Sequence, residues 1–238
     1  MVGRQTKAFS VVVAACAAAA GLGGLTGCGS ESKVSASSLK PRLLPASLTP
    51  GFHLLRTLDW SDPVNLVGEG IFLPELTHPS QAVKEVRDAG FRGAVGEQLN
   101  RGGPNGTDIR SGVAEFKSAG GAEKVRDWMY SEDLQQPCFA QCIFSPRNLA
   151  LSGVPGAKAV RQVPSAQPPG PPPGVKLPPG VKAPRVAPGS GPPTRYLAEF
   201  TIGDDLYFVS TEGNAAARAR FVTGIQQYYK RLQGLHVS

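Results

Sequence analysis

Residues 195–210 read RYLAEFTIGDDLYFVS and give the clearest structural signal in this sequence of 238 residues. Two segments rich in aromatic and β-branched residues, 195–202 and 206–210, flank the turn residues Gly203-Asp204-Asp205. Apolar segments of strand length on either side of a short Gly/Asp turn are typical of a β-hairpin. We therefore expect two antiparallel strands here, and we take them as the centre of the fold.

Further helix and strand signals lie on both sides of this hairpin. Sequence patterns predict helices at 80–89, 118–134 and 214–232 and strands at 91–98, 109–117, 148–153 and 157–163. In the last helix, apolar side chains recur at the spacing of one buried face: Phe221, Ile225, Tyr228 and Leu232. Strands joined mainly as hairpins, together with helices, predict an α+β domain in which an antiparallel sheet packs on helices in two layers.

The first 27 residues have the pattern of a lipoprotein signal peptide. Arg4 and Lys7 precede an uncharged apolar segment at 8–22, which is short for a membrane span. The tetrad Leu25-Thr26-Gly27-Cys28 then matches the bacterial lipobox, which predicts lipidation of the Cys28 thiol and cleavage before it. An ordinary secretory signal with a chance cysteine is the alternative. The lipobox predicts a mature protein held by its acyl chains on the extracytoplasmic face of the cell membrane.

The mature chain divides into a tether and a single domain. Residues 28–50 are rich in Ser, Lys and Pro and lack periodicity, so we expect a flexible tether. Residues 51–238 have the pattern of one α+β domain that a Pro-rich insertion interrupts at 164–194. Residues 164–193 hold 12 Pro and 5 Gly, which favours an extended, disordered segment. A linker between two domains is less favoured, because residues 195–238 are too few to bury a core alone.

The formal net charge of +7 is concentrated around this insertion. Between Leu134 and Ala198 there is no Asp or Glu but seven Lys or Arg residues, whereas the rest of the chain is balanced. Within the insertion, Lys176, Lys182 and Arg185 are candidate contacts to anionic lipid headgroups or acidic wall polymers. A solvated basic loop is an equally favoured alternative. The exported location disfavours nucleic acid as a partner.

Two cysteines, Cys138 and Cys142, lie in the mature chain beyond the lipobox. In an oxidising exterior such a pair most often forms a disulfide. A reduced pair remains open, and so does a redox or metal-binding pair, although a C-x3-C spacing outside a thioredoxin-like context speaks against redox chemistry. The histidines His53, His78 and His236 are scattered singly, so the sequence predicts no metal site.

No catalytic motif stands out in the sequence. The patterns G-x-S-x-G of serine hydrolases and H-E-x-x-H of zinc proteases are absent, and so is a phosphate-binding loop with a lysine. The carboxylate pairs Glu132-Asp133 and Asp204-Asp205 fit a surface-exposed helix end and a hairpin turn better than acid–base catalysis. We therefore expect no catalytic residues, no cofactor and no enzymatic activity.

The sequence resembles the LpqN-type small lipoproteins of actinobacteria, whose fold is similar to that of the PsbP proteins of photosystem II. The resemblance lies in the lipobox, in residues 90–93 before a strand, in residues 116–122 opening a helix with Trp128, and in residues 196–232. It implies a PsbP-like antiparallel sheet packed on helices and a binding or accessory role in the cell envelope. It supplies no catalytic residues.

Together these features predict a membrane-anchored envelope lipoprotein. Its non-enzymatic domain is expected to bind a ligand or an envelope protein of unknown identity. The alternative is an envelope enzyme or enzyme accessory whose site is not visible as a motif. A deep pocket in which polar groups of perturbed pKa converge would favour that alternative.

Overall fold

The computed structural model describes residues 33–68, 78–102, 107–135, 144–164 and 193–237. All of them belong to one compact unit, Glu31–Ser238. Several predictions lie outside the described residues: the signal peptide, the lipidation of Cys28, the disulfide between Cys138 and Cys142, and the anionic contacts of Lys176, Lys182 and Arg185. These stay predictions.

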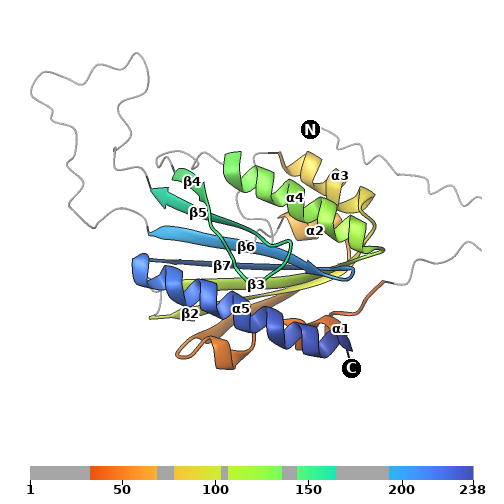
Figure 1. The fold of residues 1–238 in the computed structure, drawn as a ribbon. Helices are drawn as coiled ribbons and strands as arrows, with labels where there is room; N and C mark the ends of the chain where they lie inside the picture. The colour runs from red at the N-terminus through yellow and green to blue at the C-terminus, as the bar shows by residue number, and fades with distance from the viewer. Residues whose placement is uncertain (1–32, 69–77, 103–106, 136–143, 165–192, 238) are drawn as a thin grey trace, which may run out of the picture. The chain divides into compact units, whose positions relative to one another are not determined.

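The described chain is built around one seven-stranded antiparallel sheet (Figure 1). Its strands are β1 (His53–Trp60), β2 (Phe91–Arg101), β3 (Thr107–Phe116), β4 (Phe144–Asn148), β5 (Lys158–Pro164), β6 (Thr194–Ile202) and β7 (Asp205–Gly213). Their order is β1-β2-β3-β7-β6-β5-β4, so β7 is central. The predicted hairpin is confirmed as β6 and β7, and Gly203 in its turn has a φ of 59°, which favours glycine.

Helices cover both faces of this sheet (Figure 1). One face carries α2 (Pro63–Gly68), α3 (Pro79–Asp88) and α4 (Ala119–Gln135). The other face carries α1 (Ala36–Leu39), two 3₁₀ turns (Lys40–Arg42 and Ala46–Leu48) and the long helix α5 (Ala215–Val237). No helix in these described ranges is long and apolar enough to cross a membrane.

The α+β class with an antiparallel sheet packed on helices is confirmed, but the expectation of two layers is wrong. The domain has three layers, since the sheet lies between two sets of helices. The reason is visible in β6, where the consecutive side chains of Tyr196, Leu197 and Ala198 are all buried. Because alternate residues of a strand point to opposite faces, such a strand needs cover on both sides.

One core lies between α5 and the sheet. The rings of Phe200 and Tyr207 stack with their centroids 5.1 Å apart, and Tyr228 of α5 meets each of them edge-on at 5.9 Å. The predicted apolar face of the last helix is buried at all four positions: Phe221, Ile225, Tyr228 and Leu232. The aromatic residues of the hairpin and the helix thus form the centre of this layer.

Residues 33–50, here called the N-terminal segment, are folded onto this core. The prediction that residues 28–50 form a flexible tether is therefore wrong for this part. Leu39 is fully buried, and Leu43 and Leu44 are 7% and 8% exposed. All three belong to the core between α5 and the sheet. The segment thus completes the layer that α5 begins.

Hydrogen bonds from α5 hold the backbone of the N-terminal segment in place. The Tyr228 hydroxyl donates to the carbonyl oxygen of Arg42. The Arg231 guanidinium donates to the carbonyls of Pro41 and Leu43, at 3.0 and 3.2 Å. These bonds satisfy carbonyl groups that a short 3₁₀ turn leaves without internal partners.

A buried carboxylate also joins this segment to the sheet. Asp205, although next to the hairpin turn, is fully buried, and its Oδ2 lies 2.6 Å from Nη1 of Arg42. The Tyr207 hydroxyl donates to the same oxygen at 2.9 Å, and His236 Nε2 lies 3.3 Å from it. Burial raises the pKa of Asp205, and the positive charge of Arg42 opposes that rise. Arg42 is therefore the main compensation for this buried charge.

Candidate ligand-binding pocket

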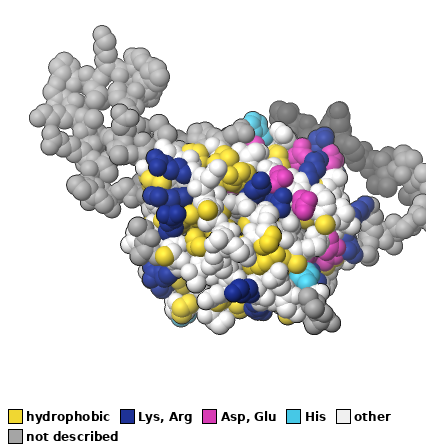
Figure 2. Space-filling view, in the orientation of Figure 1, with side chains coloured by type: hydrophobic (Ala, Val, Ile, Leu, Met, Phe, Trp, Pro, Cys, Tyr) yellow, Lys and Arg dark blue, Asp and Glu magenta, His cyan; other side chains and the backbone are white. Residues whose placement is uncertain are grey.

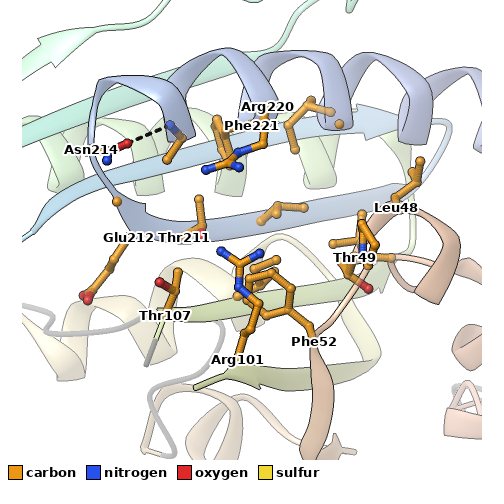
Figure 3. A pocket seen from close by; sticks show the side chains of 18 residues that line it. Leu48, Thr49, Phe52, Arg101, Thr107, Thr211, Glu212, Asn214, Arg220 and Phe221 are labelled. Atoms are coloured by element: carbon orange, nitrogen blue, oxygen red, sulfur yellow. Dashed lines mark hydrogen bonds between the residues drawn. The ribbon is translucent and has the colours of Figure 1, made fainter. Parts of the chain in front are cut away.

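A pocket of about 330 Å³ opens between α5 and the sheet (Figure 3). Its walls come from the first half of α5, from the ends of β2 and β7, from the start of β3, and from the end of the N-terminal segment. Strand β7 passes into α5 through Gly213 and Asn214, which both line the pocket. The Asn214 side chain accepts a hydrogen bond from the amide of Ala217 at 3.3 Å and so caps α5.

The interior of the pocket is apolar. Four of its lining residues belong to the core between α5 and the sheet: Leu44, Val209, Phe221 and Ile225. Leu48 of the second 3₁₀ turn also lines the pocket. Because the N-terminal segment supplies one wall, the pocket forms only when that segment is folded.

Two exposed cations, Arg101 at the end of β2 and Arg220 on α5, lie at the mouth of the pocket. Figure 3 shows both guanidinium groups reaching into the space between α5 and the sheet. The guanidinium carbon of Arg101 lies 4.9 Å from the centroid of the Phe52 ring, a cation–π contact. Among the described residues, neither guanidinium has an ion-pair partner.

The acidic residue at the pocket is compensated elsewhere. Glu212 lines the pocket, but its Oε1 lies 3.0 Å from Nε of Arg195. In Figure 3 the Glu212 side chain points away from the guanidinium groups of Arg101 and Arg220. The mouth therefore keeps a positive charge.

The carboxyl groups with the most strongly raised pKa lie away from the pocket, where the end of α4 packs on the sheet. Glu132 and Asp133 were expected at a surface-exposed helix end, and this prediction is wrong: they are 6% and 7% exposed, because the end of α4 packs on β5 and β6. Burial raises the pKa of Asp133 to about 6 and that of Glu199 on β6 well above its usual range. Neither residue lines the pocket.

The structure brings none of the predicted site residues together, since Cys28, Cys138, Cys142, Lys176, Lys182 and Arg185 all lie outside the described residues. It does place one end of the Pro-rich insertion: Thr194, the first residue of β6, pairs with Gly213 at the pocket. Within the described ranges, no group of three or more His, Cys, Asp or Glu side chains could hold a metal ion.

Sequence reasoning missed both cations of the pocket. Arg101 follows the predicted strand at 91–98, and Arg220 lies one position before Phe221 in the predicted last helix. The helical periodicity could have marked Arg220 as a neighbour of the buried face. Nothing in the sequence links it to Arg101, because only the sheet order brings β2 and α5 to the same pocket.

Comparison with known proteins gives a likeness to a solved structure. No family model matches the chain, and no curated protein matches it. Among solved structures, the chain is similar to the extracellular domain of PknH from Mycobacterium tuberculosis, with a TM-score of 0.50 and 11% sequence identity. The match covers 84% of this chain and 99% of that chain. At this identity the likeness shows a shared fold, and the resemblance to LpqN-type and PsbP proteins stays a prediction.

Proposed function

We propose that this chain is a lipid-anchored protein of the cell envelope whose α+β domain binds a ligand, without catalysis, in the pocket between α5 and the sheet. The observation that carries the proposal is the pocket itself, which has an apolar interior and, at its mouth, two cations that have no ion-pair partner among the described residues. The N-terminal pattern of a lipoprotein signal peptide and the likeness to an extracellular domain support a location outside the cytoplasmic membrane. The absence of Asp133 and Glu199 from the pocket lining favours binding over acid–base catalysis.

The folded N-terminal segment brings the domain close to its proposed anchor. The amide of Val34 donates to the carbonyl of Arg92 on β2 at 3.2 Å, and Val34 follows Cys28 by six residues. Six residues span at most about 20 Å when fully extended. A lipid on Cys28 would thus hold the α1 end of the domain near the membrane surface.

Replacing the lipobox cysteine is expected to release the protein from the membrane. In a bacterial host that processes lipoproteins, the wild-type chain should label with an alkyne fatty acid and sediment with membranes. The Cys28→Ser variant should lose the label and appear in the soluble fraction, because it lacks the thiol that carries the acyl chains. Cys16→Ser, a cysteine substitution within the signal segment, is the matched control and should keep both properties. Unchanged labelling of Cys28→Ser would refute the anchor.

Filling the pocket is expected to abolish binding of an apolar probe. Gly224 lines the pocket, shares a helix face with Ala217 and Phe221, and has open space where a Cβ would stand. Gly224→Leu should therefore occupy the pocket and, since leucine favours helix, keep the domain stable. The measurement is the fluorescence of the neutral dye aminoanthracene, which rises on entering an apolar site.

Gly234→Leu provides the matched control for this experiment. Gly234 lies on the same helix, also has open space at the Cβ position, and does not line the pocket. The wild-type chain and Gly234→Leu should bind the dye equally, whereas Gly224→Leu should lose at least about tenfold in affinity. Equal binding by all three chains would show that the pocket is not the binding site.

A further inference from the structure

We propose that this pocket binds an amphiphile with a single apolar chain and an anionic head group, either a carboxylate or a phosphate monoester. The chain lies in the apolar interior, and the head group lies at the mouth between Arg101 and Arg220. This inference rests on the proposed binding function and adds to it the chemical class of the ligand.

The interior selects for an apolar chain. Its surface is continuous with the core through Val209 and Ile225, and Leu44 closes it from the N-terminal segment. At about 30 Å³ for each water-sized unit, a volume of 330 Å³ holds on the order of ten heavy atoms. Each methylene group transferred from water into such a site raises affinity about fourfold, so chain length should matter up to that size.

The mouth selects for an anion. The face of the Arg101 guanidinium packs against Phe52, which restrains the side chain and leaves the N–H edge free to donate. Arg220 stands on α5 across the pocket mouth, and no ion pair occupies it among the described residues. Two guanidinium groups that converge on one opening form charge-assisted hydrogen bonds with a carboxylate or phosphate.

The charge around the opening supports this choice. Figure 2 shows Lys and Arg side chains without acidic neighbours at the end of the domain where β5 ends and β6 and α5 begin, whereas toward the opposite end acidic and basic side chains are mixed. Glu212, the acidic residue of the pocket lining, already pairs with Arg195. A cationic amphiphile would be repelled here, and a sugar would place its hydroxyl groups against an apolar wall without partners.

The test is displacement of aminoanthracene from residues 29–238 by four amphiphiles of equal chain length: decanoate, decyl phosphate, decanol and decyltrimethylammonium. One or both anions should displace the dye at concentrations at least about tenfold below decanol, and the cation should be weakest. The order of the two anions identifies the head group as carboxylate or phosphate.

Variants of the two cations then place the head group. Arg101→Gln and Arg220→Gln should each weaken the preferred anion about tenfold and leave decanol unchanged. Arg218→Gln, an exposed arginine of the same helix outside the pocket lining, is the control and should behave as wild type. Melting temperatures of all variants show whether the fold is retained.

Two outcomes would overturn the proposal. The first is displacement of the dye by decanol at concentrations as low as those of the anions in the wild-type chain. The second is an unchanged preference for the anions in the double variant Arg101→Gln with Arg220→Gln. Either outcome refutes an anionic ligand. If one of these outcomes is found but Gly224→Leu loses dye binding, the pocket is still the binding site and the ligand belongs to a different chemical class. If the wild-type chain binds no dye at all, the binding function fails as well.

Discussion

Deleting residues 33–50 is expected to abolish cooperative folding of the domain. The deletion removes Leu39, Leu43 and Leu44 from the core between α5 and the sheet. Full burial of one such side chain contributes about 1.5–3 kcal/mol, and domains of this kind are stable by only about 5–15 kcal/mol. The deletion also removes Arg42, which leaves the buried carboxylate of Asp205 without its main counter-charge.

Two chains make this comparison directly, one beginning at Lys33 and the other at Gly51. Thermal unfolding followed by circular dichroism should show a sharp transition for the first chain and a broad or absent one for the second. A chain beginning at Gly51 that melts as sharply, and within a few degrees, would show that the N-terminal segment is dispensable.

Single substitutions separate packing from chain length. Leu39→Ala, at a fully buried position, should lower the free energy of unfolding by about 2–5 kcal/mol. Leu55→Ala makes the same chemical change on β1 at a position that is 62% exposed, and it should cost less than about 1 kcal/mol. Similar losses in the two variants would contradict the assignment of the segment to the core.

The N-terminal segment was missed because its structure depends on contacts distant in sequence. Its helix and turns are three or four residues long, and Pro41 and Pro45 interrupt any helical period. Its order comes from the leucines it buries and from α5, whose Tyr228 and Arg231 bind its carbonyl groups. Composition therefore predicted a tether where tertiary packing makes a wall of the pocket.

The hairpin and the last helix were predictable because their signals are local. A Gly-containing turn between two apolar segments fixes β6 and β7, and the period of apolar residues fixes the buried face of α5. The third layer could also have been predicted, because Tyr196, Leu197 and Ala198 are apolar at consecutive positions and a strand with apolar side chains on both faces needs cover on both. The pocket was not, because Arg101 and Arg220 meet only through the sheet order.

Lowering the pH from 7 to 5 is expected to stabilise the domain, through the carboxyl pair below α4. Asp133 and Glu199 are 7% and 1% exposed, and no N–H or hydroxyl donor among the described residues reaches the oxygens of Glu199. Burial raises the pKa of both groups. The charge of Asp133 adds to the rise at Glu199, where Arg126 only partly opposes it. The charge of Glu132 adds to the rise at Asp133, where the hydrogen bond with Glu199 opposes it. One proton on the pair lets one carboxyl donate a hydrogen bond to the other.

The direction of the pH effect follows from proton binding in the two states. In the unfolded chain both carboxyl groups have ordinary pKa values near 4, whereas in the folded chain the pKa of Asp133 is about 6. Between these values the folded state binds more protons than the unfolded state, so stability rises as the pH falls through 6 and levels off below about 4. The contribution of Asp133 is reached in full only below about pH 4, so between pH 7 and 5 this group should add on the order of 1 kcal/mol to the free energy of unfolding.

Glu199→Gln should remove the part of this dependence that comes from Glu199 and from its coupling to Asp133. The amide fills the same space without a charge and can donate to the Asp133 carboxylate, so we expect the variant to be more stable than the wild type at pH 7, by on the order of 1–3 kcal/mol. Its advantage should shrink as the pH approaches 5, where the wild-type pair is already protonated.

Glu123→Gln, on the exposed face of α4, makes the same change and should leave the pH profile unaltered. Because Asp205 is also buried with a raised pKa, a residual slope of the same sign should persist in Glu199→Gln. The measurement is the melting temperature of each chain from pH 4.5 to 8. Two results would show that Asp133 and Glu199 are not a buried pair of acids that share a proton: a wild-type melting temperature that falls as the pH is lowered through 6, or a Glu199→Gln chain less stable than wild type at pH 7.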